Sequence, residues 1–276
     1  YLLTQLGAKS RLESFKLHYY PNKIKSFTHS RVRNPFWNRL QLYTQVFSEF
    51  SYGQTKYIPV IKHPHHQENV RQLFVQFDKE RLKLLPIWVN EQYQLLDLLE
   101  DRQADMLFNQ FTGHQHIGKT KNQMAEFYGM SQLEFSFFLF DTIEQLIQLI
   151  KQHREKFPLT YRILHIVELE CNLGLSGSTY LTYEHIKNGY SISQIAQIRN
   201  IKENTVKEHI LEIAFVFEQF PYNSFVPSDL YEQLNKIMSE NDDFNFNDMT
   251  NVIEDVEFFQ YRLVELERMR KNENSN

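Results

Sequence analysis

The stretch between residues 189 and 210 restricts the fold more than any other feature of the chain. Gly189 can end one helix where a positive φ is needed, and Ser191 can cap the next helix. Asn200 suits a left-handed turn after that second helix. Ala196 is small enough to let a third helix cross close to it. The apolar residues expected on the inner sides of these helices are Ile195, Ile201, Val206 and Ile210.

This arrangement predicts a helix-turn-helix whose third helix begins near Lys202. In DNA-binding proteins of this kind the corresponding helix enters the major groove, so its outer face would meet phosphates or base edges. Arg199, in the turn, would reach the DNA backbone. The residues predicted to contact DNA are Arg199, Lys202, Asn204, Thr205, Lys207 and His209.

The charge pattern is also compatible with a helix-turn-helix that does not bind DNA. Between residues 181 and 214, four Lys and Arg residues are balanced by four Glu residues, whereas a DNA-reading module usually has a basic surplus. Residues 1–64 hold ten basic and two acidic residues, a net charge of +8, and residues 218–276 hold five basic and thirteen acidic residues, a net charge of −8. Only the first segment favours a polyanion, so a helix-turn-helix used for protein contact stays an alternative.

Further residues extend the pattern beyond the three helices. They are Ser178, Thr179, Thr182, Tyr183, Tyr190, Gln194, and the stretch 258–263. Together with the residues above they resemble, over about residues 178–268, the helicase helix-turn-helix domain of some bacterial RecQ-type helicases, which also occurs in YpbB-type proteins of Gram-positive bacteria. The long N-terminal part, which is not that of a helicase, points to the YpbB type. The resemblance implies a non-enzymatic accessory protein that binds fork or duplex DNA beside a RecQ-type helicase in DNA repair or recombination.

The turn pattern recurs 71 positions earlier in the chain. The matching residues are Gly118, Thr120, Gln123, Met124, Ala125, Phe127 and Met130, with Gly129 at the turn position of Asn200. The next helix is nearly all apolar between residues 133 and 139, which a groove-facing helix should not be. We therefore predict a degenerate helix-turn-helix-like unit at about residues 113–140, with its last helix buried or facing a partner.

Few residues in the chain break helices. Hydrophobic residues make up 42% of the 276 residues, while Gly and Pro number only 8 each, which favours helices over short strands. The predicted fold class is all-α, with an N-terminal helical scaffold domain at residues 1–174 and a C-terminal helix-turn-helix domain at residues 178–270. The helices expected outside the three short ones span residues 39–50, 68–85, 89–110, 121–129, 133–155, 158–172, 228–239, 246–256 and 258–270.

The N-terminal segment mixes cations with aromatic residues and is interrupted by Pro21 and Pro35. Such a segment can hold single-stranded nucleic acid by stacking bases on rings such as Trp37 beside Lys and Arg. It can also place its aromatics in a core and leave its cations in solvent. The possible secondary nucleic-acid patch comprises Lys16, Lys23, Lys25, Arg31, Arg33 and Arg39.

Other chemistry is weakly indicated. Residues 113–120 fit the P-loop formula, but the surrounding sequence lacks the alternating strands and helices that a P-loop needs. Histidines at positions 63, 65, 66, 114 and 116 could bind a metal, although loop histidines are mostly solvated. Cys171, the single cysteine, is expected in an apolar helix. We expect no enzymatic activity, no metal, no cofactor and no small-molecule substrate.

No apolar run approaches the roughly 20 residues that cross a bilayer, so we expect a cytoplasmic, nucleoid-associated protein with no membrane contact. The helicase-associated role is favoured, and two alternatives stay open. One is a sequence-specific transcription regulator, because such regulators share the pattern at residues 189–210. The other is a protein-interaction adaptor without direct DNA binding.

Overall fold

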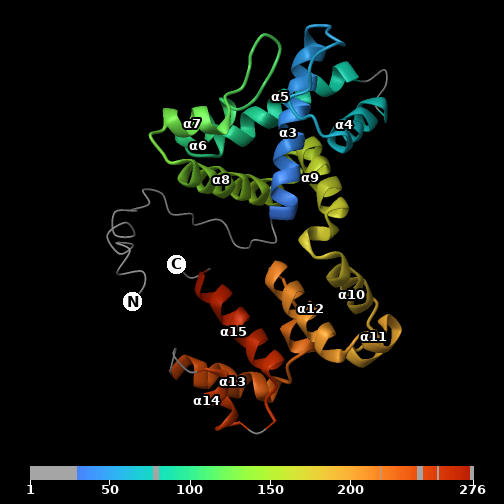
Figure 1. Cartoon of the computed structure of the whole chain (residues 1–276), viewed down its shortest axis with the longest axis vertical. Helices are drawn as coiled ribbons and strands as arrows, with labels where there is room; N and C mark the ends of the chain where they lie inside the picture. Colours follow the sequence, from blue (N-terminus) through green and yellow to red (C-terminus); the bar gives the residue numbers. More distant parts are fainter. Residues whose placement is uncertain (1–29, 77–80, 218, 241–244, 254, 274–276) are drawn as a thin grey trace, which may run out of the picture. The chain divides into compact units, whose positions relative to one another are not determined.

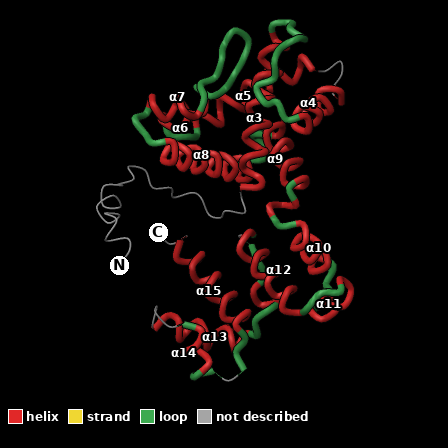
Figure 2. The backbone as a smooth tube through the Cα atoms, viewed as in Figure 1, coloured by secondary structure: helices red, strands yellow, loops and turns green. Residues whose placement is uncertain are grey.

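The structure is a computed structural model that describes residues 30–76, 81–217, 219–240, 245–253 and 255–273. In these ranges every regular element is a helix, which confirms the predicted all-α class (Figures 1 and 2). The chain divides into two compact units, Tyr1–Glu170 and Cys171–Asn276, called unit 1 and unit 2 below. Lys16, Lys23 and Lys25 of the predicted N-terminal patch lie outside the described residues.

Two long helices organise unit 1. The first, α3, contacts α4, α5, α8 and α9, and the second, α8, also lies against α6 and α7 (Figure 1). Their inner faces supply buried apolar side chains such as Phe36, Leu40, Phe135 and Ile143. The helices of unit 1 are α3 (Ser30–Ser51), α4 (Pro64–Gln76), α5 (Arg81–Asp97), α6 (Asp101–Phe108), α7 (Lys121–Phe127), α8 (Gln132–Gln152) and α9 (Pro158–Glu170).

Several predicted helix boundaries in unit 1 are wrong. The helix expected at residues 68–85 is instead divided between α4, which begins at Pro64 and ends at Gln76, and α5, which begins at Arg81. Two further differences have clear physical reasons. Helix α3 begins at Ser30 and continues through Pro35, which was expected to interrupt it. A proline there removes one backbone hydrogen bond, and burial of the aromatic residues that follow outweighs this loss. The helix expected at residues 89–110 is two helices, and the second starts after Glu100, whose backbone N–H donates to the Gln103 side chain at 3.2 Å.

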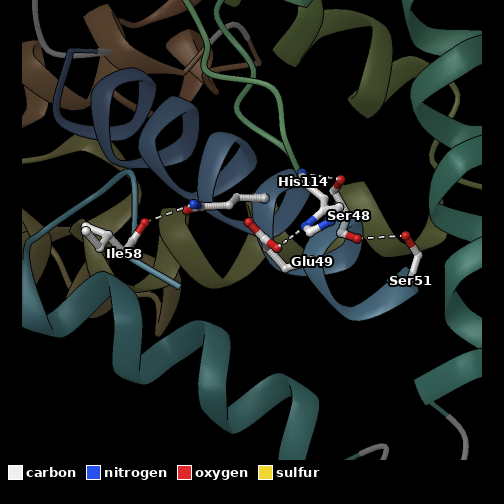
Figure 3. A network of polar contacts seen from close by, with 6 residues as sticks. Ser48, Glu49, Ser51, Ile58 and His114 are labelled. Carbon is white, nitrogen blue, oxygen red and sulfur yellow. Dashed lines mark hydrogen bonds and ion pairs between the residues drawn. The ribbon is translucent and has the colours of Figure 1, made fainter. Parts of the chain in front are cut away.

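A polar network fixes the loops that flank α3 (Figure 3). The His114 Nδ1 atom lies 2.9 Å from a carboxylate oxygen of Glu49. The Gln45 side chain donates to the Ile58 carbonyl oxygen at 3.0 Å and accepts from the Val60 N–H at 2.7 Å. One helix therefore holds both the loop that follows it and the distant turn that contains His114.

Unit 2 is centred on α12, which contacts α10, α11 and α15 (Figure 1). Val206, Ile210, Leu234 and Leu263 are fully buried in its core. Its α-helices are α10 (Gly177–Lys187), α11 (Ile192–Arg199), α12 (Glu203–Val216), α13 (Ser228–Glu240), α14 (Phe246–Thr250) and α15 (Phe258–Glu273). A 3-10 helix, η3 (Asn172–Gly174), precedes α10, and a second, η4 (Tyr222–Ser224), lies between α12 and α13.

The connection between the units lies at the end of α9. Helix α9 ends at Glu170 rather than near residue 172, and the division between the units falls there. Cys171 was expected inside an apolar helix, but it follows the helix end and is half-buried.

Candidate nucleic-acid interface

The turn that leads into α12 has the predicted geometry. Asn200 adopts the left-handed conformation, with a φ of 52° and a ψ of 48°. Ser191 caps α11, because its side chain accepts from the Gln194 backbone N–H and its own N–H donates to the Gln194 side chain at 2.9 Å. Gly189 has a φ of 81°, which suits glycine at the end of α10. The sequence predictions for these positions are confirmed.

One side of helix α12 is buried, and the other side, called its open side below, is exposed. Val206 and Ile210 are completely buried, and they pack in the same core as Ile195 and Ala196 of α11. The small side chain of Ala196 belongs to this packed side, as predicted. The exposed residues at the beginning of α12 are Lys202, Glu203, Asn204 and Glu208.

Three of the predicted DNA contacts lie on or beside this open side. Lys202 and Asn204 are exposed, and Thr205 is half-buried. Lys202 stands at the N-cap of α12, and its side chain makes no capping hydrogen bond. The first backbone N–H groups of a helix attract anions, and a lysine beside them adds a positive charge. Chemically, this end of α12 can bind a phosphate, while an amide such as that of Asn204 can reach a base edge.

Lys207 makes a contact within unit 2. Its ammonium group pairs with the Glu257 carboxylate, and its side chain is only 20% exposed. With Glu203, it also lines a hollow of about 640 Å³ between the start of α11 and the residues around η4. A DNA contact by Lys207 would therefore compete with an existing ion pair.

Arg199 and His209 are tied to α10 rather than to the open side of α12. One guanidinium N–H of Arg199 donates to the Thr182 hydroxyl oxygen, and another donates to Ser178 Oγ at 3.0 Å. The Thr182 hydroxyl lies 2.8 Å from His209 Nδ1. Because Thr182 already accepts from Arg199, its hydroxyl proton is available to the Nδ1 atom of a neutral imidazole.

Electrostatics favour the same protonation state of His209. Burial lowers the pKa of the imidazole, and the positive charge of Arg199 lowers this pKa further. Burial also lowers the pKa of the Arg199 guanidinium. In this arrangement, Arg199 and His209 fix α12 against α10. They therefore orient the open side of α12 without being part of it.

Sequence reasoning missed Glu212, which joins α12 to the start of α10. Its carboxylate accepts from the Ser176 backbone N–H at 2.8 Å and from the Thr179 hydroxyl, at the start of α10. The only hint in the sequence is a charged residue next to Ile213 in the apolar part of α12. A carboxylate at a helix N-terminus is stabilising, so Glu212 anchors α10 to α12.

Two residues of the predicted secondary patch are not on the surface. Arg33 is 4% exposed and Arg39 is 2% exposed. The Arg33 guanidinium lies 3.0 Å from the Glu144 carboxylate, and Arg39 pairs with Glu170. Since an unpaired buried charge is strongly destabilising, these pairs are what allow both cations to lie in the core. Arg31 is the exposed member of the patch among the described residues.

The residues that fit the P-loop formula form a tight turn. In the described part of the chain, α6 rather than a strand precedes them, and Gly113 pairs with His116 in an isolated bridge. A Cβ atom added to Gly118 would lie 2.3 Å from the Gln110 carbonyl oxygen, so this glycine permits close backbone packing. Among the described residues, no group of three or more His, Cys, Asp and Glu side chains could hold a metal ion.

Comparison with known proteins agrees with the geometry of unit 2. Residues 178–265 match the family model of a helix-turn-helix domain. The sequence is 24% identical to protein YpbB of Bacillus subtilis (strain 168) in an alignment 243 residues long, and the match covers 83% of this chain. The matched region spans 64% of the length of that relative. No solved structure matches the chain. None of the described helices has the length and apolarity that crossing a membrane requires. Unit 2 thus carries a helix-turn-helix domain, and the chain as a whole is distantly similar to YpbB.

Proposed function

We propose that unit 2 binds DNA through the beginning of α12, and that the protein is a non-enzymatic accessory factor of a RecQ-type helicase in DNA repair or recombination. The helix-turn-helix match over residues 178–265 supports the DNA-binding part. The helicase part rests on the resemblance of the same region to the C-terminal domain of RecQ-type helicases and on the distant similarity to YpbB.

The position of Lys202 carries the proposal. A cation at a helix N-terminus opposes the helix dipole, and Lys is not a residue that caps helices well. Lys202 nevertheless occupies the N-cap of α12 and is exposed. Residues that break a local stability rule are often functional ones. A DNA phosphate at this point would interact favourably with both the lysine and the free N–H groups.

Binding is tested by fluorescence anisotropy with duplex, forked and single-stranded DNA at two salt concentrations. The helicase-associated role predicts a preference for the fork and a steep salt dependence. Lys202→Glu should weaken binding strongly, whereas Lys236→Glu, an equal charge change on the exposed side of α13, should have little effect. If both variants lose the same affinity, the interaction depends on net charge and not on the position of Lys202. If the native chain does not bind, DNA is not the ligand.

The helicase partnership needs its own test. A RecQ-type helicase from the source organism should bind the full chain in solution and unwind a forked substrate faster in its presence. The Lys202→Glu variant should keep helicase binding if the partner contacts a different surface. Absence of both binding and stimulation would contradict this part of the proposal, whatever the DNA measurements give.

One observation favours a second candidate, a protein-interaction adaptor. The open side of α12 carries Glu203 and Glu208 beside Lys202, and Lys207 is already paired with Glu257. Such mixed charge suits a protein surface better than a phosphate backbone. The adaptor predicts no salt-dependent DNA binding, so the same anisotropy experiment separates the two functions.

A further inference from the structure

We propose that unit 1 contains a binding site for a small phosphomonoester of nucleotide size, in a hollow between α3, the turn before α7, and α8. The hollow has a volume of about 450 Å³, within the range of small-ligand sites. The inference concerns unit 1 alone and does not depend on DNA binding by unit 2.

One part of the hollow offers hydrogen-bond donors and positive charge. Lys121 lines it, as does Lys119, whose ammonium donates to the Asn109 side chain at 3.0 Å and would turn toward a bound anion. Helix α3 contributes Asn34, Asn38 and Gln41 at helical spacing. None of the described residues that line the hollow is an Asp or a Glu. Ammonium groups and amide N–H groups donate to phosphate oxygens, and the absence of lining carboxylates leaves an anion without repulsion at close range.

The charges around Lys121 are incompletely balanced. Arg33, which lies nearby, is neutralised by Glu144 at 3.0 Å. The Lys121 ammonium instead lies over the Phe140 ring, 5.4 Å from its centroid, and Arg33 lies over the same ring at 4.3 Å. Desolvation by the surrounding chain and the charge of Arg33 both lower the pKa of Lys121. Among the described residues Lys121 makes no ion pair, so a bound anion would supply its counter-charge.

The remaining wall is apolar and includes two aromatic rings. Its residues are Trp37, Val60, Ile61, Leu139, Phe140 and Ile143. Trp37, Leu139 and Ile143 are almost fully buried, so a free inorganic phosphate would leave uncovered the half-buried Val60, Ile61 and Phe140. A ligand that joins a phosphate to a planar or apolar body would cover both parts, and a mononucleotide has this composition because its base can lie against aromatic and aliphatic side chains.

The walls are held in place by contacts that need no ligand. The Gln41 side chain donates to the Gln110 carbonyl oxygen at 3.2 Å, and the Lys119 backbone N–H donates to the Asn109 carbonyl oxygen at 2.7 Å. The loop that supplies Val60 is fixed to α3 by the network in Figure 3. A site with fixed walls loses little conformational entropy when it binds, which favours affinity for a small molecule.

The site can be tested with the tryptophan that lines it. The full chain has two tryptophans, and Trp88→Phe leaves Trp37 as the reporter of the hollow. Titration with deoxyadenosine 5′-monophosphate should change the fluorescence saturably. Deoxyadenosine and inorganic phosphate should each bind at least about tenfold more weakly, because each lacks one half of the contacts. Calorimetry on the unsubstituted chain with the same three compounds repeats this comparison without any variant.

The lysines are tested together, with a single exposed lysine elsewhere in unit 1 as a control. Joint replacement of Lys119→Gln and Lys121→Gln should weaken the monophosphate by at least about tenfold. Lys156→Gln removes one charge from an exposed position outside the hollow and should leave the affinity within about twofold. Circular dichroism checks that the variants are folded.

Two oligonucleotides distinguish the sources of the phosphomonoester. A short strand with a 5′-phosphate that binds unit 1 more tightly than its 5′-hydroxyl counterpart identifies a DNA end as the ligand. Equal binding of the two strands, with tight binding of the monophosphate, identifies a free nucleotide. The proposal is overturned if the monophosphate does not bind, if deoxyadenosine binds equally well, or if the folded lysine variant keeps its affinity.

Discussion

Units 1 and 2 contain the same helical turn, used in two different ways. Thr120 in unit 1 and Ser191 in unit 2 both cap a short helix, each with a φ of −72° and a ψ of 162°. The left-handed position after that helix is Gly129 in one copy, with a φ of 64°, and Asn200 in the other, with a φ of 52°. The turn is therefore a local structure that the chain forms twice.

The closing hydrogen bond of the turn is also repeated. The Met130 N–H donates to the Ala125 carbonyl oxygen at 2.9 Å, and the Ile201 N–H donates to the Ala196 carbonyl oxygen at 3.0 Å. The preceding segments differ, because unit 2 has α10 before its turn while unit 1 has the bridged turn at residues 113–116. The helix-turn-helix-like segment predicted at about residues 113–140 thus contains the turn and the helix that follows it. Its first helix is replaced by the bridged turn.

The helices after the two turns explain the different uses. Helix α8 places the buried Phe138 where α12 has His209, and its N-cap is Ser131 where the N-cap of α12 is Lys202. Ser131 forms a reciprocal capping box with Glu134. Side chains on the helix after the turn, and not the turn itself, decide whether that helix becomes part of a core or keeps an open side.

The comparison predicts that α8 is a core helix of unit 1. Phe135 is completely buried, and Phe135→Ala should lower the free energy of unfolding of unit 1 by about 3–5 kcal/mol. Urea unfolding followed by tryptophan fluorescence reports on unit 1, because Trp37 and Trp88 both lie there. Phe127→Ala removes an equal side chain that is 62% exposed and should cost much less. Similar losses in the two variants would show that α8 is not a core helix.

A sharper test concerns the shared left-handed position. Gly129→Ala should destabilise unit 1 by about 1–2 kcal/mol, because an L-residue other than Asn or Asp rarely adopts this conformation. A Cβ at Gly129 would meet nothing within 4 Å, so the cost is conformational rather than steric. Gly129→Asn copies unit 2 and should be less costly in the same urea titration. Equal costs for Ala and Asn would mean that the two turns are not equivalent.

Substitutions at the N-caps of α8 and α12 should change helix stability in opposite directions. Ser131→Ala removes a cap and should cost about 1 kcal/mol, whereas Lys202→Ser adds one and should gain up to about 1 kcal/mol. Hydrogen exchange of the amides in α8 and α12 measures both effects within one protein. The idea that α12 sacrifices stability for function fails if Lys202→Ser destabilises its helix.

The smallest expected effect depends on pH. The folded state lowers the pKa of His209 below its usual 6.5, so its stabilising contribution is complete above that value and is lost as the pH falls through the lowered pKa. His209→Phe copies Phe138 of unit 1 and should reduce the fall in melting temperature between about pH 7.5 and pH 5, measured by circular dichroism. If the melting temperature falls by the same amount in His209→Phe as in the native chain, His209 does not contribute to the loss of stability in acid.

Local features of the fold were predictable from the sequence, whereas long-range ones were not. The roles of Ser191 and Asn200 follow from residues within one turn, so their pattern is readable in the sequence. The continuation of α3 through Pro35 depends on burial by other helices. Arg33 could not be recognised as a core residue, because its partner Glu144 is 111 positions away.

The candidate site shows the same division. Spacing predicted the open side of α12, since helical periodicity separates Lys202 and Asn204 from the buried residues. It could not predict that Lys207 pairs with Glu257, or that Arg199 bonds to Thr182, because these partners belong to other helices. Polar residues that helical spacing places on the outer face therefore include some whose side chains bond to other helices of the fold.

The most direct test of this account is the salt dependence of DNA affinity for the native chain and for Lys202→Ser. A lysine that contacts a phosphate should, when removed, weaken binding and reduce the slope of log affinity against log salt by about 0.9. We predict this loss together with an unchanged or more stable α12. An identical slope and affinity in the two proteins would contradict the claim that the beginning of α12 is kept open for DNA.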